Sequence, residues 1–102
     1  MFVKMSKESF LDALKKVEAA IEYEPATGIL QNVQITTDEK GIVLCAENEN
    51  MKVAKRIIAG GFPEDGTWAD IEHLRAAVEA LNAKEITIYG HSKGKIEIME
   101  AC

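Results

Sequence analysis

The chain has 102 residues, of which 47% are hydrophobic and 28% charged, and its formal net charge at pH 7 is −5. This length fits one domain spanning residues 1–102, and the composition is typical of a globular protein rather than a disordered one. The negative charge argues against wrapping of nucleic acid by the whole surface, because phosphate binding depends on Lys and Arg, although it is compatible with a local basic patch.

The first half of the chain predicts a strand, a helix and three further strands. Residues 2–5 read as extended, and Ser6 is expected to cap a helix over residues 6–22. Proline at position 25 ends that helix, since the residue before proline avoids helical geometry. Three strands should follow, separated by polar turns, over residues 29–37, 42–46 and 51–59.

The second half predicts a helix and a hairpin. A long turn at residues 60–66 precedes a helix over residues 70–82, capped by Asp70, and Trp68 is expected to pack over this helix. Two strands of alternating polarity then follow at residues 85–89 and 95–99, joined by a hairpin loop at residues 90–94.

The predicted order is therefore β-α-β-β-β-α-β-β, which defines an α+β fold. Both helices are apolar on one side only, so both should pack on one face of an antiparallel sheet. The expected core consists of the inward-facing residues of these elements: Phe10, Leu14, Val17, Ile21, Val33, Ile35, Leu44, Leu74, Val78, Leu81, Ile86, Ile88, Ile96 and Ile98.

The residue pattern predicts a protein that is not an enzyme and needs no metal or cofactor. The segment from Gly90 to Lys95 is one residue short of a phosphate-binding loop, and a strand follows it where a helix would be needed. Cys45 lies in an apolar strand, where a structural role is expected. His73 and His91 fall on different elements without metal-ligand spacing. The two cysteines, Cys45 and Cys102, form no disulfide framework, which favours an intracellular, cytoplasmic location.

Three strand sequences carry a family resemblance. They are Ile29 to Ile35 (ILQNVQI), Gly41 to Glu49 (GIVLCAENE) and Met51 to Ile57 (MKVAKRI). With the turn, helix and hairpin that follow, they resemble the N-terminal domain of the bacterial DNA polymerase III beta subunit, a DNA sliding clamp. The resemblance covers about residues 1–100 and is a pattern over the whole domain rather than a catalytic motif.

The resemblance implies a non-catalytic processivity factor in DNA replication, without a cofactor. Sliding clamps are rings of six such domains whose helices line a hole around DNA. The implied partners are duplex DNA, held weakly and without sequence preference, a DNA polymerase or other replication proteins, and further copies of the chain joined through sheet edges. No membrane is implied, and no residues match the partner-peptide pocket, which belongs to a later clamp domain.

The predicted DNA contacts are Lys15, Lys16 and Arg75, on the exposed sides of the two helices. Residues 6–22 contain three lysines against four acidic residues, and residues 70–82 contain one arginine against three. This excess of negative charge keeps an alternative open: a protein-interaction module that retains the clamp fold without encircling DNA. An enzyme or small-ligand binder would require a deep polar pocket.

Overall fold

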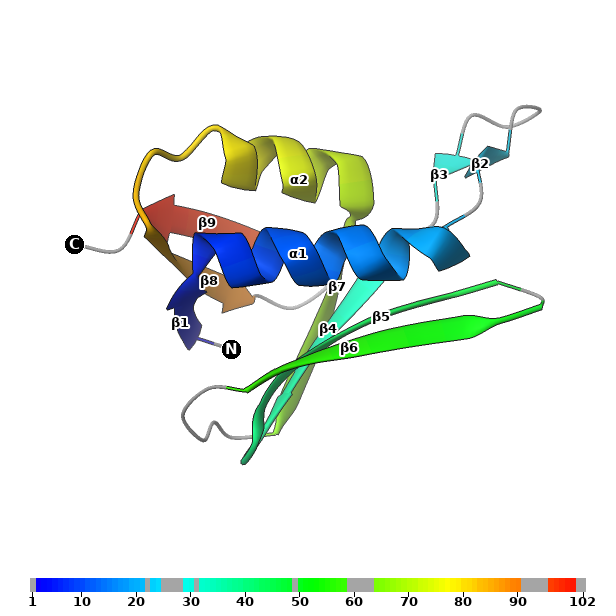
Figure 1. Cartoon of the computed structure of the whole chain (residues 1–102), viewed down its shortest axis with the longest axis horizontal. Coiled ribbons are helices and arrows are strands. Elements are labelled where there is room, and N and C mark those ends of the chain that lie inside the picture. The colour runs from blue at the N-terminus through cyan, green and yellow to red at the C-terminus, as the bar shows by residue number, and fades with distance from the viewer. Residues whose placement is uncertain are drawn as a thin grey trace.

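The computed structural model describes residues 2–21, 23–24, 29–30, 32–48, 50–58, 64–90 and 96–100. Two helices lie side by side and run in opposite directions, with antiparallel strands packed against them (Figure 1). The predicted α+β class and the predicted succession of helices and strands are confirmed. No helix within the described residues is both long and apolar enough to cross a membrane.

The helical elements are α1 (Lys7–Val17), a 3₁₀ turn η1 (Glu18–Ala20) that continues it, and α2 (Ile71–Glu79). The strands are β1 (Phe2–Ser6), β2 (Tyr23–Glu24), β3 (Ile29–Leu30), β4 (Asn32–Asp38), β5 (Gly41–Glu47), β6 (Lys52–Ile58), β7 (Asp65–Asp70), β8 (Glu85–Gly90) and β9 (Ile96–Glu100).

The strands form two main sheets where the sequence analysis expected one. One sheet has the order β6-β5-β4-β7 and the other β1-β8-β9, while β2 and β3 form a short separate ladder. The division arises because β8 pairs with the N-terminal strand, placing Val3 opposite Ile88 and Met5 opposite Ile86. Within the described residues, each sheet presents two open edges, at β6 and β7 in the first and at β1 and β9 in the second.

Helix α1 begins at the predicted cap and buries one side. The Ser6 hydroxyl accepts a hydrogen bond from the backbone N–H of Ser9, with an N···O distance of 3.3 Å. Phe10 and Leu14 are fully buried, and the helix packs against β5 and β6. The last predicted turn tightens into η1, which ends where Ile21 N–H donates to the Glu18 carbonyl.

Helix α2 also begins at its predicted cap. Asp70 Oδ1 accepts hydrogen bonds from the backbone N–H groups of Glu72 and His73, each with an N···O distance of 3.0 Å. Leu74 and Val78 are buried, and the helix contacts both α1 and β7. The two helices therefore pack beside each other, each with its apolar side turned towards the sheets.

One hydrophobic cluster forms the core, as predicted. Ten of the predicted core residues are buried, and four are partly buried against the cluster: Ile21, Leu81, Ile96 and Ile98. Val3 and Met5 of β1 and Ile42 of β5 are also buried, although the expected core did not contain them. These residues are inward-facing members of paired strands, where alternate side chains enter the core.

Strand β7 was not predicted. Residues 64–66 carry turn chemistry, yet β7 pairs with β4 from Thr37 opposite Asp65 to Asn32 opposite Asp70. Trp68 was expected to pack over the second helix, but it lies in β7 with 47% of its surface exposed. The predicted turn between β4 and β5 is confirmed, with Gly41 at a φ of 133°, a value that favours glycine.

Candidate nucleic-acid interface

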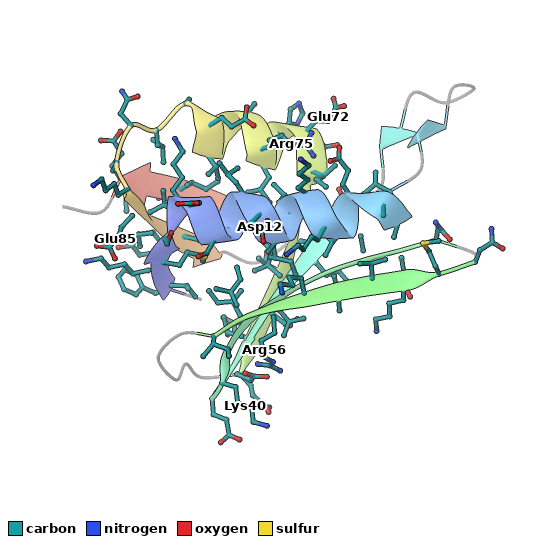
Figure 2. All side chains as sticks on the ribbon, viewed as in Figure 1. Asp12, Lys40, Arg56, Glu72, Arg75 and Glu85 are labelled. Carbon is teal, nitrogen blue, oxygen red and sulfur yellow. The ribbon has the colours of Figure 1, made fainter. Side chains whose placement is uncertain are left out.

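The two helices present one continuous exposed side, which we call the helix face. On α1 and η1 this side carries Glu8, Asp12, Lys15, Lys16 and Glu18, and on α2 it carries Glu72, Arg75, Ala76 and Glu79. Figure 2 shows Asp12 near the middle of α1 and Arg75 near the middle of α2. Of the three predicted DNA contacts, Lys15 and Lys16 lie on α1, and Arg75 lies on α2, where its contact with Glu18 places it beside the C-terminal end of α1.

Two of the three predicted cations are engaged by carboxylates. Lys16 Nζ lies 3.0 Å from Asp12 Oδ2, one helical turn away, and both side chains are more than half exposed. Arg75 Nη2 lies 2.7 Å from Glu18 Oε1, which joins α2 to η1. Lys15 is exposed and forms no ion pair with any described residue. Sequence reasoning grouped these cations correctly but could not reveal their partners.

The charge of the helix face is negative. Three cations stand against five carboxylates, which are Glu8, Asp12, Glu18, Glu72 and Glu79. Lys7, at the start of α1, is not counted as a positive charge of the helix face, because its ammonium group donates a hydrogen bond to the Leu81 carbonyl. Since nucleic-acid affinity grows with the number of phosphates that cations neutralise, the excess of carboxylates on this face disfavours tight contact with a phosphate backbone.

A second group of cations lies along the β6 edge. Lys52 and Arg56 are exposed, on the side of the strand away from Val53 and Ile57, which pack against the core. Arg56 donates two hydrogen bonds to the Asp38 carboxylate, at 2.7 and 2.9 Å. Those bonds, together with one from the Lys40 backbone N–H, lower the pKa of Asp38 to about 2.

An open groove of about 470 Å³ lies between α2, β7 and β9. Its walls are mainly apolar, with Leu74, Ala77, Ile96 and Ile98 among the lining residues and the half-exposed Trp68 beside them. Asp70 also lines the groove, but its carboxylate already caps α2. The groove therefore offers an open, mainly apolar contact surface beside α2.

Among the described residues, the cysteine and histidine candidates Cys45 and His73 lie on different elements. Cys45 is buried in β5, which agrees with the structural role expected for it. His73 is exposed on α2, with Nδ1 3.8 Å from Asp70 Oδ1. The described residues do not include His91, Lys93, Lys95 and Cys102, and most of the predicted hairpin loop also lies outside them. Among the described residues, no group of three His, Cys, Asp or Glu side chains could hold a metal ion.

Comparison with known families identifies one match. The family described as "DNA polymerase III beta subunit, N-terminal domain" matches residues 1–101. No curated protein sequence matches the chain. The resemblance inferred from the strand sequences is therefore confirmed at the level of the family.

Solved structures show the same fold. The beta subunit of DNA polymerase from Streptococcus pyogenes superposes with a TM-score of 0.85 at 16% identity, over 99% of this chain and 28% of that chain. A DnaN sliding clamp from Bartonella birtlesii bound to griselimycin gives 0.82 at 19% identity, over 100% of this chain and 27% of that chain. The Helicobacter pylori beta clamp bound to a DNA ligase peptide gives 0.83 at 15% identity, over 98% and 28%. The chain thus spans a little over a quarter of the length of these clamps.

Proposed function

Because this chain belongs to the family of the N-terminal domain of the DNA polymerase III beta subunit, we propose that it acts as a sliding-clamp-like processivity or replication accessory protein. In this role residues 1–102 work as one clamp domain in the cytoplasm, without catalysis or a cofactor. Duplex DNA is the substrate that it encloses, and a polymerase or another replication protein is the factor that it retains.

One structural observation supports this function above the others. The two helices lie side by side and pack against the strands, and each sheet leaves open edges, among them those of β6 and β9 (Figure 1). Edges of this kind can join domains into a larger sheet by backbone hydrogen bonding. In such an assembly the helices would share one surface, and that surface would face the DNA.

Two of the open edges, those of β6 and β9, are complementary in charge, which supports assembly from several copies. β6 carries Lys52, Lys55 and Arg56, whereas β9 carries Glu97 and Glu100. A contact between the β6 edge of one copy and the β9 edge of the next joins two different surfaces. When each copy makes the same contact, the copies form a ring if the rotations between neighbours add up to a full turn. We therefore propose head-to-tail self-association through β6 and β9.

Retention on circular DNA tests the enclosure directly. The protein is mixed with closed circular plasmid and with the same plasmid cut once, and both are passed through a sizing column at moderate salt. Enclosure predicts co-elution with the circle and loss from the linear form, because a ring slides off a free end. Equal retention on both forms, or steep loss with added salt on both, would contradict enclosure.

A second candidate function is a protein-interaction module. It is supported by the negative helix face and by the apolar groove beside Trp68, which together favour a protein surface over a phosphate backbone. Absence of binding to both plasmid forms, from a sample shown to be folded, would favour this alternative over the clamp.

A further inference from the structure

The contact between Arg75 and Glu18 bears on how the helix face meets DNA. Arg75 Nη2 lies 2.7 Å from Glu18 Oε1, and the two side chains are 29% and 44% exposed. Nη2 itself is shielded from solvent, and its N–H groups are not aimed closely enough at the oxygen to form a hydrogen bond. The contact is thus an ion pair in which the carboxylate lies close against the guanidinium group.

Glu18 is held in place by the backbone around it. Its own N–H donates to the Leu14 carbonyl, and its carbonyl accepts from the N–H of Ile21. The backbone of Glu18 is therefore held by hydrogen bonds on both its N–H and its carbonyl, and its side chain extends from this fixed position. The negative charge beside Arg75 repels a phosphate that approaches the same guanidinium group.

Lys16 forms a similar ion pair with Asp12, but that pair is weaker. Its ammonium nitrogen lies 3.0 Å from Asp12 Oδ2, and the pair is more exposed than Arg75 and Glu18. Exposed pairs of this kind are easily broken, because water and salt screen them. The half-buried contact at Arg75 is the one that should limit phosphate binding.

We propose that Glu18 is an intramolecular mask on Arg75, which keeps the helix face in a state of low affinity for duplex DNA. This inference rests on the proposed function, because it concerns the face that a clamp would turn towards DNA. With Arg75 masked, the face offers fewer cations to the phosphates, so retention would depend mainly on enclosure and the protein would remain free to move along the duplex. Loss of the Glu18 charge would convert Arg75 into a phosphate contact.

The test compares single charge changes on a short linear duplex, where no ring is required. Binding of a fluorescently labelled duplex of about 30 base pairs is measured by anisotropy over a salt series for the wild type, Glu18→Gln and Glu79→Gln. Both variants remove one negative charge from the helix face, but Glu79 forms no ion pair with any described residue. Glu79→Gln therefore controls for net charge alone.

We expect Glu18→Gln to bind about tenfold more tightly than Glu79→Gln at 50 mM salt, because one released cation can neutralise one more phosphate. The logarithmic salt slope should steepen by about 0.9, the contribution of one phosphate on duplex DNA. In an Arg75→Gln background the extra gain from Glu18→Gln should disappear, as expected when two groups act through one contact.

Equal gains from Glu18→Gln and Glu79→Gln would overturn the mask, because only net charge would then matter. A gain from Glu18→Gln that persists in the Arg75→Gln background would also overturn it, as would no gain at all. Circular dichroism and thermal unfolding establish that each variant is folded. Retention of the wild-type protein on circular plasmid is a separate measurement. A negative result for the Glu18 mask therefore does not change the conclusion about enclosure.

Discussion

The ion pair between Asp38 and Arg56 ties together three strands of the larger sheet. Asp38 ends β4 and Arg56 lies in β6, and β5 runs between those two strands. Arg56 donates two hydrogen bonds to the same carboxylate, a geometry that fixes both side chains more firmly than a single contact. The pair therefore resists separation of β6 from the rest of the sheet.

Replacement of Asp38 by Asn should destabilise the protein at neutral pH but not in strong acid. The pKa of Asp38 is lowered from 3.8 to about 2 by Arg56 first and by the Lys40 N–H second. A lowered folded-state pKa contributes stability above pH 4, which is lost as the pH falls towards 2. Urea unfolding at several pH values should show the two proteins converging between pH 4 and pH 2.

Asp12→Asn provides the matched control for that experiment. It removes a carboxylate from an exposed pair on α1, where the expected change in stability is small at every pH. A constant difference between Asp38→Asn and the wild type from pH 7 down to pH 2 would contradict the ion-pair explanation. It would point instead to the turn geometry, since Asp38 also accepts from the backbone N–H of Lys40.

The ion-pair partners of individual charged side chains were the hardest feature to predict from the sequence. Lys15, Lys16 and Arg75 could be placed on exposed helix sides, because helical periodicity fixes the side on which a residue lies. The pairing of Arg75 with Glu18, and of Arg56 with Asp38, depends on how separate elements pack. Local spacing carries no information about such contacts, although it did permit the Lys16–Asp12 pair, which is four residues apart in one helix.

At the scale of elements, the stability of α2 should depend on its buried side. Leu74 is 2% exposed and lies in the core cluster, so Leu74→Ala should lower the free energy of unfolding by about 2–5 kcal/mol through lost burial and the cavity left behind. His73→Ala, one position earlier on the exposed side, should change it by no more than about 0.5 kcal/mol. Chemical unfolding measures both, and similar losses in the two variants would contradict the observed orientation of the helix.

The elements differ in how clearly the sequence predicts them. Both helices and their caps at Ser6 and Asp70 follow from apolar spacing and capping chemistry, and both are confirmed. β7 was missed because Asp65 and Gly66 have turn propensity, which pairing with β4 overrides. The division into two sheets was also missed, since it depends on β8 pairing with the first strand of the chain rather than with a neighbour in sequence.

At the scale of the whole molecule, assembly should depend on the charges of two edges. Lys52 and Lys55 lie on β6, and Glu97 and Glu100 lie on β9. A head-to-tail contact brings these groups together between copies, so sedimentation at tens of micromolar protein should show species heavier than the 11.2 kDa chain. Changing both lysines to Glu, or both glutamates to Lys, should return the protein to monomer by placing like charges opposite each other.

Mixing the two charge-reversed variants distinguishes edge pairing from a general effect of charge. In the mixture, the acidic β6 edge of one variant can meet the basic β9 edge of the other, and the remaining edges are complementary as well. Assembly should therefore be restored, although each variant alone is monomeric. Lys15→Glu, which changes charge on the helix face, should leave assembly intact. A mixture that stays monomeric while both variants remain folded would show that β6 and β9 do not join the copies.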